Sequence, residues 1–148
     1  MTTLIWQPDL AIAAARAAGL EVGAVDIEIL PRPHKQPGRL PVGKMAVYLF
    51  SSAWQVLKIG KAGPNSHARF SSHHYAPGRA MSTLAGKIIA DREWPGGPRP
   101  DPGYIGEWIK RNCDRVNLLL DSGLGTAAMT SLEEWLIREL RPRYEGTA

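Results

Sequence analysis

The chain has 148 residues, 44% of them hydrophobic and 22% charged, which is ordinary for a globular protein and sufficient for one domain with a sizeable core. No apolar run approaches the ~20 residues of a membrane-spanning helix, a single cysteine excludes an internal disulfide, and no His or Cys residues have zinc-site spacing. The net charge of +4 permits nucleic-acid binding without establishing it. Since the N-terminus lacks the pattern of a signal peptide, we expect a cytoplasmic protein.

The first 44 residues are predicted to form an N-terminal arm and a linker. Residues 9–19 have a helical pattern, with Asp9 as a cap, many alanines and Gly19 at the end. Residues 22–30 have the composition of a strand. Residues 31–43 contain four prolines and three cationic side chains, which is typical of an extended linker. Either a plain spacer or a DNA-contacting arm fits this composition, and the spacer is the simpler interpretation.

The next stretch is predicted to be a β-hairpin. Two apolar runs, residues 46–50 and 56–60, are separated by a five-residue loop. The expected register pairs Phe50 with Val56, Leu49 with Leu57, Tyr48 with Lys58 and Val47 with Ile59. One face of the hairpin is then wholly aliphatic. The other face brings the Tyr48 phenol and the Lys58 ammonium within reach of each other.

The remainder of the chain predicts mostly helices. A turn after the hairpin leads into a helix that holds His67, Arg69, Phe70 and His73. Further elements are expected in this order: a helix at 79–90, a Pro/Gly loop at 92–103, a helix at 104–112, a strand at 115–121 and a helix at 126–140, which Pro142 ends. The fold class expected from this order is α+β, with a small three-stranded antiparallel sheet flanked by helices.

The last helix carries two adjacent glutamates in different positions. On a helical wheel Glu133 lies beside the apolar stripe, whereas Glu134 lies on the far side. A carboxylate at the flank of the core has to be ion-paired, hydrogen-bonded or bound to a metal. The pattern leaves open a salt bridge of Glu133 to Arg69 or another cation, and a metal site.

These elements resemble the GIY-YIG nuclease domain over about residues 45–145. The residues that carry the resemblance are Ala46-Val47-Tyr48, Lys58-Ile59-Gly60, Arg69, His73 and the run EEWLIRELRPRY at 133–144. Lys58 replaces the usual tyrosine of the second motif, as in a branch that includes some restriction enzymes. The resemblance implies a nuclease domain at 45–148 with an insertion around 71–103.

Two features depart from the family pattern. Glu145 stands where an asparagine often follows the final tyrosine, so a supporting contact at that position is in doubt. Residues 104–106 spell a literal Tyr-Ile-Gly, but they lie 56 residues beyond Tyr48 and open a helix. We therefore interpret them as a decoy and not as the hairpin partner.

The resemblance implies a metal-dependent endonuclease that hydrolyses DNA phosphodiester bonds. Tyr48 would act as general base, although a free phenol has a pKa of ~10. Lys58 would either lower that pKa as a cation or, as a neutral amine, take the phenol proton directly. Arg69 would contact the phosphate, His73 would contact it or assist the leaving group, and Glu133 would hold one Mg²⁺ or Mn²⁺. No acidic residue near Tyr48 or Arg69 in sequence supplies a second metal site.

Each of these residues also has an ordinary structural interpretation. Tyr48 could be a strand aromatic, Lys58 an edge-strand charge, and Arg69 with His73 a solvated helix face. The nucleic-acid path is expected to include Lys61, His74, Arg79 and Lys87. Recognition would come from the 1–44 arm, the 71–103 insertion, a homodimer or a partner protein. The alternative function is a catalytically inactive nucleic-acid-binding module.

Overall fold

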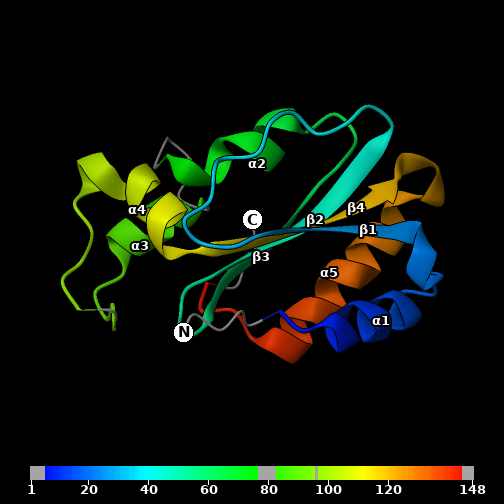
Figure 1. Ribbon diagram of the computed structural model, residues 1–148, viewed down its shortest axis with the longest axis horizontal. Helices are drawn as coiled ribbons and strands as arrows, with labels where there is room; N and C mark the ends of the chain where they lie inside the picture. The colour runs from blue at the N-terminus through cyan, green and yellow to red at the C-terminus, as the bar shows by residue number, and fades with distance from the viewer. Residues whose placement is uncertain (1–5, 77–82, 96, 145–148) are drawn as a thin grey trace.

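A computed structural model, which describes residues 6–76, 83–95 and 97–144, has an α+β fold built on one antiparallel sheet (Figure 1). The sheet has four strands in the order β1-β4-β2-β3. Their bounds are β1 (Val25–Leu30), β2 (Lys44–Ser51), β3 (Val56–Ala62) and β4 (Asp114–Asp121). The α+β class is confirmed. The expected count of three strands is wrong, because the N-terminal segment supplies β1 as an edge strand against β4.

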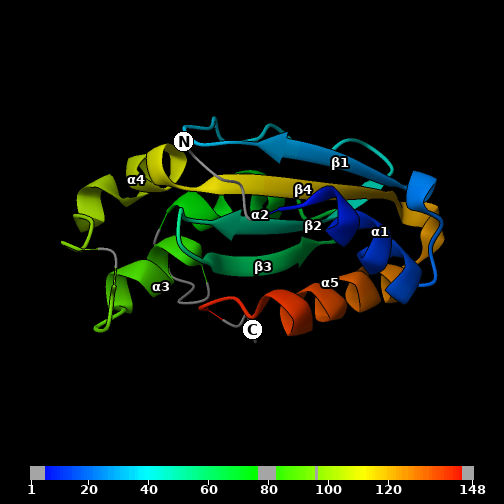
Figure 2. The same cartoon turned by 60° about the horizontal axis from the view of Figure 1, so that its bottom comes forward.

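Helices cover both faces of the sheet (Figure 2). Their bounds are α1 (Pro8–Ala17), α2 (His67–Ser71), α3 (Leu84–Ala90), α4 (Ile105–Asn112) and α5 (Thr126–Leu140). Helices α1 and α5 share one core with one face of the sheet, and α2, α3 and α4 share a second core with the other face. Within the described ranges, no helix combines the length and the apolar character needed to cross a bilayer.

The central strand β2 is buried on both sides. Its alternate residues Val47 and Leu49 enter the core under α5, whereas Tyr48 and Phe50 enter the core under α2 to α4. This alternation follows from the period-two geometry of a strand. The catalytic-candidate Tyr48 is therefore held inside the second core and does not stand on an open sheet surface.

The described part of residues 1–44 belongs to the same layers as the rest of the chain. Helix α1 packs against α5, and β1 extends the sheet. Residues 31–43 have no helix or strand, and Leu40 within them is only 2% exposed and lies in the second core. Apolar side chains of residues 6–43 thus pack into both cores, whereas an arm would lie outside them.

The hairpin register differs from the predicted one by two residues. The structure pairs Tyr48 with Gly60 and Phe50 with Lys58, and a bulge follows before Ser51 pairs with Val56. Tyr48 and Lys58 still share a face, because a shift of two preserves the alternation. The bulge turns Leu57 into the second core, so its predicted place on the aliphatic face is wrong. The reason is a turn shorter than expected, closed by the hydrogen bond from Ser52 N–H to the Gln55 carbonyl.

The C-terminal tail covers half of the outer edge of β3. The backbone N–H groups of Arg143 and Tyr144 donate to the carbonyls of Val56 and Leu57, both at 2.9 Å. The Tyr144 hydroxyl then donates to Asp91, at the end of α3, at 2.7 Å. In the described part of the chain, no strand pairs with the other half of this edge, residues 59–62.

We expect Tyr144→Phe to lower the free energy of unfolding by about 1–2 kcal/mol, because it removes a hydrogen bond to a carboxylate. Urea denaturation measures the change. Tyr104→Phe is the matched control, since Tyr104 is 44% exposed. Equal stability of the two variants would contradict the role of Tyr144 in closing the edge.

Candidate active site

Tyr48 lies in the middle of the sheet, with Gly60 opposite on β3 and Asn117 opposite on β4. Its ring lies directly over Gly60, because a Cβ added at that glycine would be 2.7 Å from the phenol oxygen. Any side chain at residue 60 would therefore displace the ring. Since β3 is the edge strand, the bare backbone of Gly60 lets the phenol approach the rim of the sheet.

His74 determines the orientation of the Tyr48 hydroxyl. The His74 Nδ1 atom accepts a hydrogen bond from the Leu84 backbone N–H at 3.0 Å, so the proton of the neutral ring is on Nε2. That Nε2–H donates to the Tyr48 oxygen at 2.6 Å. Burial, helped by the nearby Lys58 ammonium, lowers the pKa of His74 to about 2, which keeps the ring neutral. The proton of Tyr48 is consequently directed away from His74.

This position corrects the assignment of His74 to the nucleic-acid path. The residue is only 3% exposed, because its imidazole packs beside the rings of Tyr48 and Phe50. Its function is to support the phenol from inside the core. The sequence offered no signal for this role, because His73 and His74 are adjacent and only one of them matches a family position.

Lys58 lies on the same face of the sheet as Tyr48 and is 4% exposed. Burial lowers the pKa of Lys58, the cations Lys87 and Arg69 lower it further, and the Glu133 carboxylate opposes them. Among the residues that the structure describes, the Lys58 ammonium has no hydrogen-bond partner. Burial thus makes the charged form of Lys58 less favourable than it is in water.

Arg69 and His73 lie on neighbouring turns after β3. Arg69 is exposed, whereas His73 is half-buried. Burial lowers the pKa of His73, and the charges of Arg69 and Lys58 lower it further. His73 is therefore neutral at pH 7, within the electric field of the two cations.

Glu133 reaches the same edge from the opposite face of the sheet. Helix α5 packs on the face away from Tyr48, yet the Glu133 carboxylate raises the pKa of both Tyr48 and Lys58. Its ion-pair partner is Lys61 at 3.4 Å, and not Arg69. Lys61, expected on the nucleic-acid path, also donates to Thr130 at 3.2 Å and so belongs to the Glu133 side of the site.

The acid–base state of Tyr48 depends on opposing effects. Burial raises its pKa above the ordinary range, Arg115 and Arg69 lower it, and Glu133 raises it. The two roles expected for Lys58, a cation that lowers the phenol pKa and a neutral amine that accepts its proton, stay predictions.

The remaining sequence-predicted residues divide into three cases. Lys87 on α3 is half-exposed and lies within electrostatic reach of Lys58. Arg79 lies outside the described residues. The Tyr-Ile-Gly at 104–106 is absent from the hairpin, as expected: it begins α4, where Gly106 packs beneath the Tyr75 carbonyl.

The donor chemistry of Glu133 fits one hard divalent cation. Mg²⁺ is commonly held by one or two carboxylates and completes its coordination shell with water and phosphate oxygens. Glu133 is only partly exposed and supplies such a carboxylate at the rim. In the described ranges, no group of three or more His, Cys, Asp or Glu side chains gathers at one point. Glu133 is thus the residue that would hold such an ion, and its carboxylate chemistry fits this role.

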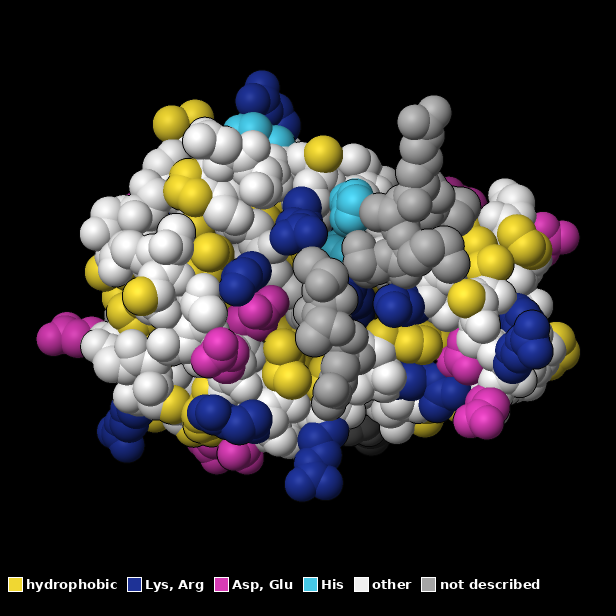
Figure 3. All heavy atoms as spheres, turned by 180° about the vertical axis from the view of Figure 1, so that it is seen from behind, with side chains coloured by type: hydrophobic (Ala, Val, Ile, Leu, Met, Phe, Trp, Pro, Cys, Tyr) yellow, Lys and Arg dark blue, Asp and Glu magenta, His cyan; other side chains and the backbone are white. Residues whose placement is uncertain are grey.

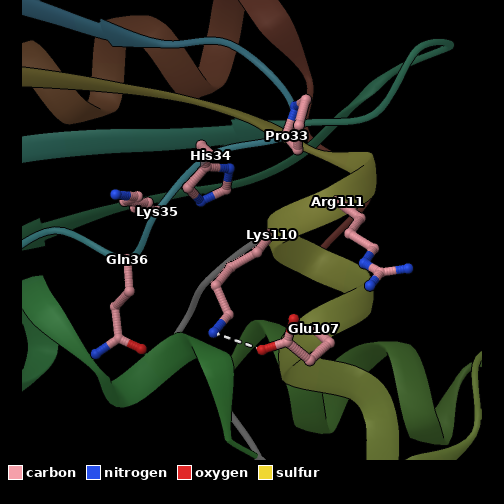
Figure 4. Close-up of a pocket in the computed structure, with 7 residues that line it drawn as sticks. All are labelled: Pro33, His34, Lys35, Gln36, Glu107, Lys110 and Arg111. Carbon is pink, nitrogen blue, oxygen red and sulfur yellow. Dashed lines mark ion pairs between the residues drawn. The ribbon is translucent and has the colours of Figure 1, made fainter.

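The face on the β3 side carries several Lys, Arg and His side chains near its middle, beside a smaller acidic group (Figure 3). A separate hollow of about 350 Å³ lies between the 31–43 segment and α4 (Figure 4). Three of its polar side chains are already paired: Lys110 with Glu107 at 2.8 Å, and His34 through both ring nitrogens. We therefore assign the candidate site to the β3 edge.

Comparisons with known proteins find no match to a family model, a curated protein or a solved structure. The resemblance to the GIY-YIG domain thus depends on the residues described above.

We expect Gly60→Ala to lower the free energy of unfolding by about 1–3 kcal/mol, because the new methyl group overlaps the Tyr48 ring. Gly63→Ala is the matched control, since the nearest atom to its added Cβ would be 3.9 Å away. Urea denaturation compares the two. Equal effects would show that the Tyr48 ring does not rest on Gly60.

Stability should fall as the pH drops below about 6.5, the ordinary pKa of histidine. His74 and His34 both have lowered pKa values in the fold, mainly through burial, so the unfolded chain binds protons that the folded chain rejects. Each histidine contributes up to about 1.4 kcal/mol per pH unit below that point. Denaturation at several pH values measures the slope, which His74→Gln should reduce; an unchanged slope in the variant would contradict the neutral His74.

Proposed function

We propose that the protein is a metal-dependent endonuclease of the GIY-YIG type that hydrolyses DNA phosphodiester bonds. One observation carries the proposal: five candidate side chains come from segments that lie in or beside the β2–β3 hairpin, where Tyr48 faces Gly60 and Glu133 pairs with Lys61, and the charges of Arg69 and Glu133 act on both Tyr48 and Lys58. They are Tyr48, Lys58, Arg69, His73 and Glu133. The net charge of +4 favours a polyanionic substrate.

In this proposal Tyr48 and Lys58 move the proton of the attacking water. The Tyr48 oxygen accepts a hydrogen bond from His74 on its buried side, which stabilises negative charge as the phenol loses its own proton. Neutral Lys58 receives that proton, and the Tyr48 oxygen takes one from the water. The general base is thus a pair of residues: Tyr48 contacts the attacking water, and Lys58 holds the proton that the phenol releases.

Arg69 and His73 act on the phosphate. The exposed guanidinium of Arg69 offers planar donors to its oxygens. His73, neutral at pH 7, donates a hydrogen bond to the phosphate or holds a water at the leaving oxygen. One Mg²⁺ or Mn²⁺ at Glu133 would polarise the phosphate and stabilise the leaving oxygen.

A second function, a catalytically inactive module that binds nucleic acid, is favoured by two observations. The pKa of Tyr48 is raised by burial, which opposes ionisation of the phenol. The Glu133 carboxylate is already balanced by Lys61. Such a module would bind DNA with salt-dependent affinity and leave it uncut, with or without a divalent cation. A homodimer or a partner protein would direct either form to its target.

Plasmid nicking in Mg²⁺ tests the proposal. We expect Tyr48→Phe and Glu133→Ala each to lose about 100-fold or more of the nicking rate, since they remove the base and the metal ligand. Each variant has a matched control. Glu134→Ala changes the exposed neighbour of Glu133 on α5, and Tyr104→Phe makes the same substitution as Tyr48→Phe in the decoy motif.

The outcomes separate the two functions. Nicking that survives both site variants would reject the site assignment. DNA binding without nicking in the wild type, unaffected by Mg²⁺, would instead support the inactive module. A protein that neither nicks nor binds DNA would reject both functions.

A further inference from the structure

Arg115 on β4 is a fully buried cation with no carboxylate beside it. Its side chain is 0% exposed, and within the described ranges it forms no salt bridge. All of its hydrogen-bond acceptors are neutral: the Asn117 side-chain oxygen at 2.7 Å, the Tyr75 hydroxyl at 3.2 Å and the Phe70 carbonyl at 2.5 Å. A buried charge without a counter-ion has a large desolvation cost, so its presence calls for an explanation.

Aromatic rings surround the guanidinium. Its central carbon is 5.0 Å from the ring centroids of Tyr48, Phe50 and Phe70. The Tyr75 ring follows at 6.0 Å. These rings attract a cation through their electron-rich faces, which partly offsets the desolvation. Only one of them, Tyr48, also belongs to the candidate site.

The N-terminal segment holds this cation in place. The Asn117 amide, which accepts from Arg115, donates to Glu28 on β1 at 2.7 Å. On the other side, His34 Nδ1–H donates to the Cys113 carbonyl, so His34 Nε2 accepts the Tyr75 proton. The Tyr75 oxygen is then free to accept from Arg115. Both chains of hydrogen bonds therefore start in residues 25–34 and end at the same guanidinium.

We propose that Arg115 is a positioning residue for Tyr48, and that its charge beneath the ring stabilises negative charge on the phenol oxygen. The inference deepens the proposed function, because an ionisable Tyr48 is what general-base catalysis requires. It also gives the N-terminal segment a role in the site: Glu28 and His34 fix the cation without neutralising it by direct contact.

The sign of the effect follows from the groups that face Tyr48. The buried cation Arg115 and the exposed cation Arg69 favour the phenolate, whereas burial and the Glu133 carboxylate oppose it. Neutral His74 donates to the oxygen and so also favours the phenolate. Lys58, on the same face, serves as proton acceptor. Arg115 is the cation least screened by water, because it is completely enclosed.

Fluorine NMR of protein labelled with a fluorinated tyrosine, whose phenol ionises at lower pH than tyrosine itself, follows the ionisation of residue 48 without DNA or metal. The signal is assigned through its loss in Tyr48→Phe. We expect Arg115→Met to move the Tyr48 titration to higher pH by about one unit or more, because the cation is lost. Arg115→Lys keeps the charge and should move it less. Methyl signals recorded in the same samples report whether each variant remains folded.

Glu28→Gln provides a second variant at an exposed position, in case Arg115→Met does not fold. It removes a carboxylate whose charge acts on Arg115 and keeps an acceptor for Asn117, so the Tyr48 titration should move the opposite way, to lower pH. Asp26→Asn is the matched control on the same strand, because Asp26 contacts Lys44 and not Asn117; its shift should be smaller.

The results decide the inference independently of nuclease activity. Shifts of opposite sign for Arg115→Met and Glu28→Gln support an electrostatic role. An unchanged Tyr48 titration in a folded Arg115→Met or in Glu28→Gln would overturn it and leave Arg115 a packing residue. A wild type that does not nick DNA would reject the proposed function but would leave this measurement intact.

Discussion

The contact between the Tyr48 ring and the backbone of Gly60 is the constraint on which the site depends. It requires a glycine in an edge strand, a register that places the two residues opposite each other, and a core that holds the ring flat. His74 and Arg115 supply that support from the buried side. The catalytic proposal needs a phenol that is held rigidly and can still lose its proton. Burial holds the ring in place but raises its pKa, which opposes loss of the proton. The hydrogen bond from His74 and the positive charge of Arg115 oppose part of this rise in pKa.

Local patterns in the sequence were sufficient for most of the fold. The last helix was predicted with both ends as observed, because its apolar stripe and the following proline are strong signals. The faces of Tyr48 and Lys58 were also predicted, since alternation survives a register shift of two. Strand β1 was predicted as a segment with strand character, but the sequence did not place it in the sheet. Its partner β4 lies almost 90 residues away, and no local pattern records such a pairing.

The buried half of the site could not be predicted for a related reason. Arg115, Asn117 and His74 act through contacts between distant segments, so neither spacing nor composition marks them. The alternation of Arg115 and Asn117 with apolar neighbours in β4 was the one available signal, because it places two polar side chains on a single covered face. The same argument explains Glu133. The helical wheel placed it at the flank of the core, but only the packing of α5 against β3 selects Lys61 as its partner.

The partly covered edge of β3 has a further consequence for how this protein behaves in concentrated solution. In the parts of the chain that the structure describes, no strand pairs with residues 59–62, and such an edge can accept the strand of another molecule. Lys61 lies in this stretch, and its charged side chain, which pairs with Glu133 at 3.4 Å, discourages a second strand. One residue thus limits self-association along an edge that is only partly covered, which would make it a poor choice for replacement in attempts to improve solubility.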